Sequence, residues 1–503
     1  MTMPVITRCL ATRDGCDTRP AISDANCRLT RAQLGHQVAA RRAWLSDQGV
    51  TPGQRVVIHL PKSVVSVSIL FACLSMGAVA VPVDIRTPGP RFARILERIT
   101  PSLMVTAPGH AAQMQGLGGP AVATATGLLE SGPAVPQVTD PPDEALALIL
   151  MSSGSTGTPK GIEITHANLR AFVDWAIDVF APRPDDRFLS IAPLHFDLSL
   201  YDLLVSQTAG AAVHVLSEQQ IAFPAEILRA AQSEQTSILY TVPTVLQMLM
   251  RLRGAVLPDL RWLLFAGEPM PPDALAGLAA LAPRAGFANL YGPTETNVIT
   301  CHMLTPQELA APPDALPIGL PCTPARVWIA DAEGAPLPAG AIGEICAAGP
   351  TVSSGYWRQP EHVLRTTVAG ERDAYRTGDL GWQADDGTLY FAGRRDRHIK
   401  IRGMVVNLDE VENVAMQSGT LSAAAATVED AGSLRARIEL HAIPRPDHGA
   451  DTAPLMQFLS ENLAPAAMPA TIRYCETLPQ TFSGKIDRAG LADHKTDLPS
   501  ESA

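Results

Sequence analysis

The stretch Leu148–His166, LILMSSGSTGTPKGIEITH, concentrates residues that suit phosphate binding. An apolar run leads into serines, threonines and glycines, and a single lysine, Lys160, follows them. Unhindered backbone N–H groups and hydroxyls can surround phosphate oxygens, and the amine adds a positive charge. No Gly-Lys-Ser/Thr follows a first glycine at Walker A spacing. A flexible linker is the alternative, but a strand-like run before the loop and a helix-like run after it favour phosphate binding.

The segments around this loop alternate between short apolar strands and amphipathic helices, which is typical of parallel α/β layers. A helix-like run starts at Pro224, and strand-like runs start at Ser237 and Leu260. From Val327 the pattern changes to strand pieces joined by Gly and Pro turns, as in a small antiparallel unit. A compact tail with helices and strands follows, and we expect its boundary near Asp396.

Composition and charge exclude several classes of protein. The chain has 503 residues, more than one core usually holds, so two or three domains are expected. Its net charge of −11 disfavours nucleic acid and anionic lipid as partners. The eight cysteines are dispersed without zinc-site spacing, and the N-terminus lacks the apolar core of a signal peptide. These features predict reduced thiols and a cytoplasmic location.

One segment, Val64–Val83, is uncharged over twenty residues and long enough to span a membrane by hydropathy alone. Three serines interrupt it, and the sequence Ser75–Gly77 is typical of a helix end before a strand. We therefore expect a buried helix followed by a core strand, and no membrane partner.

Four further motifs follow the loop: NLYGPTETN from Asn289, YRTGDLG from Tyr375, GRRDRHIKIRG from Gly393 and LPQTFSGKIDR from Leu478. With SSGSTGTPKGIEITH, they resemble in order the signatures of the adenylate-forming (ANL) superfamily. This superfamily includes acyl-CoA ligases, luciferases and the adenylation domains of nonribosomal peptide synthetases. The resemblance implies an α/β fold in which residues 1–395 form a large adenylation domain, with two α/β sheet subdomains and a small β-barrel-like subdomain. Residues 396–503 would form a small mobile α+β domain.

The resemblance also assigns ATP-binding residues. Tyr291 would stack on adenine, and Glu295 would hold Mg²⁺, a hard cation that prefers carboxylate oxygen. Asp379, in a TGD turn, would accept hydrogen bonds from the ribose hydroxyls, with Arg394 near the same sugar. From the residues alone, Glu295 could be a solvated turn residue and Asp379 an ordinary turn residue. The remaining assigned positions are Ser152, Ser153, Gly154, Ser155, Thr156, Gly157, Lys160, Asn289, Gly292, Thr294 and Lys485.

The expected catalytic group comprises Thr156, Glu295, Lys400 and Lys485. By resemblance, Lys485 enters the cleft and neutralises the substrate carboxylate and the α-phosphate; the alternative is an ordinary exposed lysine. A carboxylate, ionised at pH 7, then attacks the α-phosphorus, and pyrophosphate leaves. A hinge at Asp396 would swing the small domain and bring Lys400 to the cleft, where a phosphopantetheine thiol accepts the acyl group.

Asp197, in PLHFDLSLYDLL, indicates which acid is activated. A buried lone carboxylate is costly without a cation, so Asp197 predicts an amine on the substrate. In amino-acid-activating relatives, an aspartate here pairs with the substrate ammonium. The alternative is a cap at the start of the following helix. The other pocket positions carried over from the family are Leu198, Tyr201, Tyr240, Leu264, Ala266, Leu290, Val298, Ile299 and Lys485.

This apolar pocket fits a small hydrophobic amino acid. It resembles the pockets of stand-alone L-prolyl-AMP ligases that load a carrier protein in pyrrole-2-carboxylate biosynthesis, although Tyr201 and Ile299 differ from the residues expected there. L-proline is the favoured substrate. Alanine, D-alanine and β-amino acids stay open, because small apolar groups differ by only about 1–3 kcal/mol in such sites. Within enzymes, an acyl-CoA ligase is the main rival, and Asp197 argues against it.

The sequence ends in SGKIDRAGLADHKTDLPSESA, without a carrier domain or a GGxS-type pantetheinylation site. We therefore expect a separate peptidyl or acyl carrier protein as partner, with phosphopantetheine on that partner. A regulator without chemistry would lack Glu295, Asp379 or Lys485, and a helper protein without enzymatic activity would be short and lack the phosphate loop. Neither alternative fits well.

Overall fold

The computed structural model describes residues 5–11, 17–87, 89–116, 120–129, 141–152, 160–359, 366–368, 371–394, 397–401, 404–429, 437–463, 467–481, 485–488 and 490–493. The chain divides into two compact units, each with hydrophobic cores of its own. The first comprises Met1–Ala341, Cys346–Thr377 and Gln383–Tyr390, and the second Ile342–Ile345, Gly378–Trp382 and Phe391–Ala503. The predicted boundary between residues 395 and 396 stays a prediction, because both residues lie outside the described ranges.

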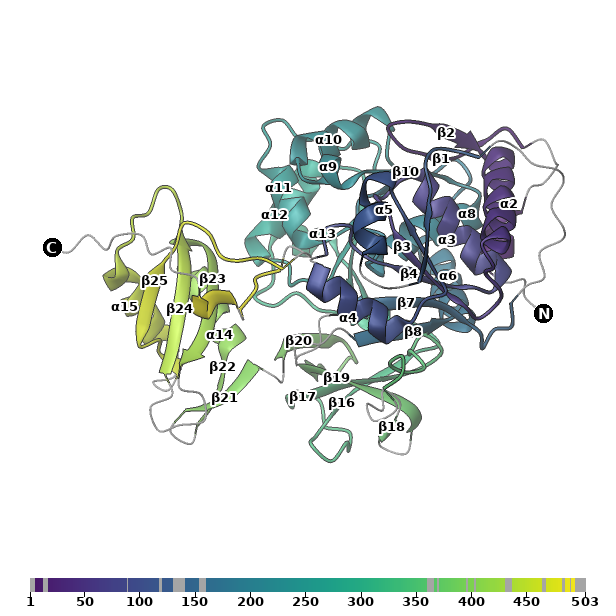
Figure 1. Ribbon diagram of the computed structural model, residues 1–503. Helices are drawn as coiled ribbons and strands as arrows, with labels where there is room; N and C mark the ends of the chain where they lie inside the picture. Colours follow the sequence, from purple (N-terminus) through teal and green to yellow (C-terminus); the bar gives the residue numbers. More distant parts are fainter. Residues whose placement is uncertain are drawn as a thin grey trace. The chain divides into compact units, whose positions relative to one another are not determined.

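Two large sheets organise the first unit (Figure 1). The nine-stranded sheet has the order β15 (Leu320–Pro321), β14 (Thr300–Met303), β13 (Gly286–Tyr291), β12 (Trp262–Ala266), β11 (Ile238–Thr241), β9 (Arg187–Ser190), β10 (Ala212–Val215), β1 (Pro20–Ser23) and β2 (Arg28–Thr30). The six-stranded sheet has the order β6 (Ala121–Thr124), β5 (Leu103–Thr106), β3 (Arg55–His59), β4 (Val79–Pro82), β7 (Leu146–Ser152) and β8 (Lys160–Thr165). The central pairs are parallel, as the alternation of strands and helices predicted.

Helices cover both faces of each large sheet. One face of β11–β13 packs against α10 (Pro224–Ser233), α11 (Pro243–Met250) and α12 (Pro272–Leu281). Between the two sheets, the largest core holds α2 (Arg31–Asp47), α3 (Val64–Met76) and α6 (His166–Phe180). The outer face of the six-stranded sheet packs against α4 (Gly89–Ile99) and α5 (Pro108–Gln115). The shorter helices are α1 (Val5–Leu10), α7 (Leu198–Leu200), the π-helix η1 (Tyr201–Val205), α8 (Ser206–Ala209), α9 (Glu218–Ile221) and α13 (Pro306–Ala310).

The uncharged segment Val64–Val83 is the predicted buried helix followed by a core strand. A capping box at Ser63 starts α3, and Gly77, in the left-handed region at φ 74°, ends it. Strand β4 follows and is fully buried. Among the described residues, no helix combines the length and the apolar character needed to cross a membrane.

The β-rich pattern expected from Val327 is confirmed. It forms a five-stranded sheet in which β20 (Leu389–Arg394) pairs with β19 and the other strands have the order β16 (Arg326–Ala330), β17 (Gly343–Ala348), β19 (Glu371–Gln383) and β18 (Thr366–Val368). Gly334 and Gly340, both at positive φ, turn the chain between β16 and β17.

The second unit is α+β, as predicted for the tail. Its elements are the hairpin β21 (His398–Ile401) and β22 (Met404–Asn407), the sheet β23 (Leu421–Glu429), β24 (Arg437–Pro444) and β25 (Thr471–Tyr474), helices α14 (Leu408–Gln417) and α15 (Thr452–Asn462), and the 3₁₀ helix η4 (Gly490–Asp493). Glu412 is buried and accepts hydrogen bonds from Arg397, at 2.7 Å, and from Arg488, at 2.7 Å. This ion-pair network ties the last predicted motif to α14.

Candidate functional site

The predicted amino-acid pocket lies on one face of the nine-stranded sheet. Tyr240 pairs with Leu264 across β11 and β12, and Ala266 pairs with Leu290 across β12 and β13. Because side chains alternate along a strand, all four face the core between the sheets. Their neighbours in sequence, such as Leu263, face the other side of the sheet and pack against α10, α11 and α12. The structure thus brings these four residues together in one buried cluster with Tyr201 and Val298, with Leu198 packed against it and Ile299 buried beside Val298.

Tyr201 closes this cluster from the helix side. It starts the π-helix η1, a distortion that is frequent at functional sites. Its ring makes an edge contact with Tyr240, with centroids 5.2 Å apart. The side chain is fully buried, its hydroxyl has no hydrogen-bond partner among the described residues, and burial raises the pKa of Tyr201. A ligand or water that accepts a hydrogen bond would relieve about 1–3 kcal/mol of desolvation cost.

Asp197 is the N-cap of α7, so the capping alternative is confirmed. Its Oδ1 accepts a hydrogen bond from the backbone N–H of Leu198 at 3.0 Å. The side chain of Asp197 is only half-buried. Burial raises the pKa of Tyr240, and the negative charge of Asp197 raises it further. A cap at this position does not exclude an ammonium partner, because a carboxylate accepts several hydrogen bonds. The pairing with a substrate amine stays a prediction.

Two buried charged residues that interact electrostatically, Lys62 and Asp202, were missed from the sequence. Lys62 is 1% exposed, and its Nζ donates to the carbonyl oxygens of Ser190, at 2.8 Å, and of Ala192, at 2.6 Å. Burial raises the pKa of Asp202, in η1, and lowers the pKa of Lys62, while each charge opposes the other's shift. The hydrogen bonds from Lys62 fix the end of β9, from which the chain runs to Asp197. The sequence signal that pointed to this interaction was Lys62 itself, a single lysine just before the apolar stretch that starts at Val64.

The predicted phosphate loop connects β7 to β8, which pair antiparallel with Ser152 opposite Lys160. The helix expected after the loop is present as α6, which starts at His166, but strand β8, which was not predicted, lies between the loop and this helix. The alternating sequence of β8 explains this, since its isoleucines face the core beside β7. The predicted residues Ser153, Gly154, Ser155, Thr156 and Gly157 lie outside the described residues, and the side chain of Ser152 does too.

The second predicted ATP motif forms the tight turn between β13 and β14. The N–H of Ile299 donates to the carbonyl of Tyr291 at 2.8 Å and closes the turn. A Cβ at Gly292 would overlap the carbonyl oxygen of Asn297, so only glycine fits this position. Tyr291 and Thr294 are half-buried at the turn, where a nucleotide could contact them.

Asn289, two residues before the end of β13 at Tyr291, has a structural role. It is buried in β13, and its Nδ2 donates to the carbonyl of Pro317 at 2.8 Å. This amide therefore braces the connection to β15, and contact with ATP stays a prediction.

Glu295 has the donor chemistry for Mg²⁺. Among the described residues, no group of three or more His, Cys, Asp or Glu could hold a metal ion. Mg²⁺ is usually bound by one or two carboxylates together with substrate phosphates and waters. A single carboxylate in the turn, whose Oε1 accepts a 2.8 Å hydrogen bond from Tyr356, fits an ion carried mainly by ATP.

Asp379 belongs to the second unit and lies within β19, rather than in the turn expected from the sequence. The preceding Gly378 has φ 73°, which bends the strand, and its N–H donates to Glu344 Oε1 at 3.0 Å. Asp379 is buried. Its contact with ribose stays a prediction.

The two predicted catalytic lysines, Lys400 and Lys485, and the hinge also belong to the second unit. Lys485 is exposed next to a short bridge between Gln480 and Ile486, and the N–H of Thr481 donates to its carbonyl at 2.7 Å. Arg394 and Lys400 lie in β20 and β21, but their side chains fall outside the described residues, as does Asp396. Their roles stay predictions.

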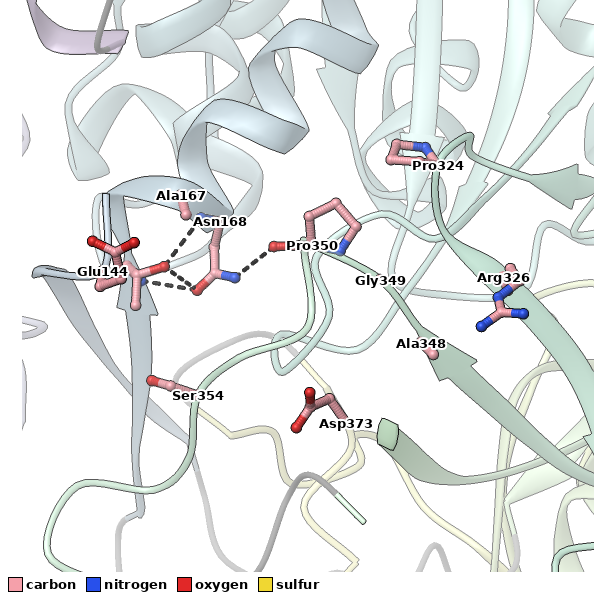
Figure 2. Close-up of a pocket in the computed structure, with 11 residues that line it drawn as sticks. Glu144, Ala167, Asn168, Pro324, Arg326, Ala348, Gly349, Pro350, Ser354 and Asp373 are labelled. Carbon is pink, nitrogen blue, oxygen red and sulfur yellow. Dashed lines mark hydrogen bonds between the residues drawn. The ribbon is translucent and has the colours of Figure 1, made fainter. Parts of the chain in front are cut away.

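A cavity of about 580 Å³ lies elsewhere in the first unit, at the start of α6 (Figure 2). Asn168 accepts a hydrogen bond from Thr165 N at 2.9 Å and donates one to Pro350 O at 2.7 Å. Arg326 pairs with Glu371. Because these polar groups are paired, we assign the cavity no ligand. Its lining residues, none of them predicted, are Glu144, Thr165, Ala167, Asn168, Pro324, Arg326, Ala348, Gly349, Pro350, Ser354 and Asp373.

Comparison with known proteins agrees with this architecture. Residues 11–357 match the family model described as AMP-binding enzyme. The L-proline--[L-prolyl-carrier protein] ligase of Pseudomonas fluorescens is 33% identical over 493 residues, covering 94% of this chain and 95% of that protein. A ligase of the same name from Streptomyces coelicolor is 34% identical, covering 82% of each chain. The crystal structure of ATP-bound MatB from Rhodopseudomonas palustris has the same fold, with 22% identity and a TM-score of 0.87 over 98% of this chain and 99% of that one. The chain belongs to the AMP-binding enzymes, the ATP-dependent adenylate-forming superfamily that its motifs predicted.

Proposed function

We propose that this enzyme activates a small apolar amino acid, with L-proline as the first candidate, and transfers it to the phosphopantetheine thiol of a separate carrier protein. The observation that carries the substrate class is the buried apolar wall of Tyr240, Leu264 and Leu290, near which the Asp197 carboxylate lies. Such a wall accepts a small hydrocarbon side chain, and the carboxylate can pair with an amine. The similarity to two L-proline--[L-prolyl-carrier protein] ligases favours proline within that class.

Adenylation then needs alignment and charge neutralisation rather than acid–base catalysis. The substrate carboxylate is already ionised at neutral pH; its oxygen attacks the α-phosphorus and pyrophosphate leaves. Asp197 would hold the ammonium, Lys160 the phosphates, and Lys485 the charge that gathers between carboxylate and α-phosphate. Mg²⁺, held by Glu295, would neutralise phosphate charge when bound.

Thiolation would use the same cleft. Rotation about Asp396 would exchange Lys485 for the strand that carries Lys400 and admit the pantetheine thiol. The pantetheine thiol loses its proton to water and its sulfur attacks the acyl carbonyl carbon. The bond from this carbon to the phosphate oxygen breaks, and AMP leaves with the bonding electron pair. A cytoplasmic location belongs to this proposal, since the seven described cysteines are free thiols.

Tyr201 favours a second candidate within the same class. Its buried hydroxyl has no partner among the described residues, so an acceptor on the ring of a small amino acid would satisfy it where the two come within hydrogen-bonding distance. A hydroxylated proline therefore belongs among the substrates to be tested.

The test is ATP–pyrophosphate exchange measured separately with L-proline, 4-hydroxyproline, L-alanine, D-alanine, a β-amino acid, a fatty acid and an aryl acid. Exchange that depends on L-proline or its hydroxylated form is the expected result. Exchange with a fatty or aryl acid alone would refute the amino-acid assignment. Exchange with alanine or a β-amino acid alone would keep the class and replace proline.

A further inference from the structure

Tyr356 contacts two residues of the proposed ATP site at once. Its hydroxyl donates a 2.8 Å hydrogen bond to Oε1 of Glu295. The Nζ of Lys160 lies over its ring, 4.9 Å from the centroid, which is the geometry of a cation–π contact. A single half-buried side chain therefore holds a carboxylate with its hydroxyl and an ammonium with its ring.

The backbone around Tyr356 forms hydrogen bonds with the two segments that contain Glu295 and Lys160. The N–H of Ser353 donates to the carbonyl of Glu295 at 2.7 Å, and the N–H of Trp357 donates to the carbonyl of Gly161 at 2.7 Å. Tyr356 itself forms a bridge with Ile162. The segment Ser353–Trp357 thus connects β8, from the six-stranded sheet, with the turn after β13, from the nine-stranded sheet.

Two further hydrogen bonds, both with the backbone of Glu163, strengthen this connection. Ser353 Oγ donates to the carbonyl of Glu163 at 2.6 Å, and the N–H of Glu163 donates to the carbonyl of Gly355 at 3.0 Å. Gly161 permits the close approach, because a Cβ there would lie 2.8 Å from Ile149 Cγ2 and 3.3 Å from Trp357 Cβ. Several contacts with β8 therefore fix the position of Tyr356.

A second tyrosine orients the Tyr356 hydroxyl. Tyr375, 8% exposed in β19, makes a side-chain hydrogen bond with Tyr356, and both rings pack with Val352. Since the Tyr356 proton points to Glu295, Tyr375 is the donor in this bond. Tyr375, Tyr356 and Glu295 thus form a chain of hydrogen bonds that ends on Oε1 of Glu295.

We infer that Tyr356 is a positioning residue of the ATP site, which orients the Glu295 carboxylate for Mg²⁺ and holds Lys160 beside the phosphate loop. The inference rests on the proposed function, in which Glu295 and Lys160 meet the nucleotide. Tyr356 engages one oxygen of the Glu295 carboxylate, and this carboxylate would hold Mg²⁺ when the ion is bound. Partners that orient a metal ligand in this way commonly change metal affinity by about 10- to 100-fold when removed.

The experiment compares Tyr356→Phe, which removes the hydroxyl and keeps the ring, with Tyr356→Leu, which removes both. Tyr474→Phe is the matched control, because it deletes a buried tyrosine hydroxyl that donates to Asp451 O at 2.9 Å in the second unit. Calorimetric titration measures ATP binding with Mg²⁺ and with EDTA, and ATP–pyrophosphate exchange gives KM for ATP and for the amino acid. Glu295→Gln is titrated in parallel, and thermal unfolding checks each variant.

We expect Tyr356→Phe to weaken binding of Mg²⁺-ATP about tenfold, with little change in metal-free ATP binding or in KM for the amino acid. Tyr356→Leu should also weaken metal-free ATP binding, because Lys160 loses its ring. Tyr474→Phe should bind like wild type.

Three results would overturn the inference. Tyr356→Phe could match wild type in both titrations, it could weaken both equally, or Glu295→Gln could leave Mg²⁺-ATP binding unchanged. Each of these leaves the proposed function intact if wild type exchanges pyrophosphate with an amino acid. A wild type that binds Mg²⁺-ATP but shows no such exchange would refute the proposed function instead, while the titrations still decide the role of Tyr356.

Discussion

Asp197 makes two separable contributions, and a pair of substitutions distinguishes them. Its Oδ1 caps α7 through the N–H of Leu198 at 3.0 Å, and its charge is proposed to hold the substrate ammonium. Asp197→Asn keeps an acceptor oxygen for the cap and removes the charge. Asp197→Ala removes both. The two variants therefore differ in stability if the cap matters, and agree in substrate binding if the charge matters.

The magnitudes follow from the position of Asp197. Truncating one partner of a buried charged pair costs about 2–5 kcal/mol, and the half-buried Asp197 belongs at the lower end. A loss of about 2–3 kcal/mol raises KM for L-proline by about 30- to 150-fold. At an N-cap, asparagine is as good as aspartate, whereas alanine costs about 1 kcal/mol. The free energy of unfolding should therefore fall only in Asp197→Ala.

The assay is amino-acid-dependent ATP–pyrophosphate exchange at saturating ATP, combined with urea unfolding. The KM for ATP is the internal control, and it should stay near the wild-type value in both variants. If Asp197→Asn kept a KM for L-proline within about threefold of wild type, less than 1 kcal/mol, the carboxylate would be a helix cap and the ammonium assignment would be wrong.

Three further predictions concern stability and nucleotide binding. Tyr201→Phe removes a fully buried hydroxyl without a partner among the described residues, so urea unfolding should show a free energy of unfolding raised by about 1 kcal/mol. Burial lowers the pKa of His59 from 6.5 to about 4. As the pH falls, the His59 imidazole is therefore protonated in the unfolded chain before it is protonated in the folded one. Stability should therefore drop between pH 6.5 and 4, by up to about 3 kcal/mol from this group, and less so in His59→Gln. Gly292→Ala should disrupt the turn against Asn297 and weaken ATP binding in a calorimetric titration.

Each of these has a clear opposite result. A destabilised Tyr201→Phe would mean that the hydroxyl has a partner in solution, such as a bound water. Equal pH dependence of wild type and His59→Gln would show that this imidazole titrates normally. A Gly292→Ala variant that binds ATP like wild type would show that the turn tolerates a rearranged backbone.

The sequence predicted the fold well where local patterns decide structure. The helix and strand within Val64–Val83, the helix from Pro224 and the strand from Ser237 are all present, because hydrophobic periodicity and end signals act over a few residues. The two local errors have non-local causes. Strand β8 exists because β7 pairs with it, and Asp379 lies in a strand because β19 is continued across Gly378 by its neighbours in the sheet.

For the candidate site, the residue types and motif order were sufficient to predict an adenylate-forming enzyme, whereas the substrate-binding roles of the pocket positions stay predictions. Sequence alone left open whether Asp197 caps a helix, and the hydrogen bond to Leu198 answers that question. The alternation of β11, β12 and β13 placed Tyr240, Leu264 and Leu290 on one face, as expected from pairing in register.

What only the tertiary structure decided is how groups distant in sequence meet. Tyr356 contacts Glu295, which lies 61 positions away in the sequence, and Lys62 contacts Ser190, which lies 128 positions away. The residues around each partner give no indication of the contact. A motif consists of side chains that a ligand needs, and the chemistry of the ligand determines the types and the spacing of these side chains. The residues that hold those side chains in place are selected by packing between sheets, and that packing exists only once the chain has folded.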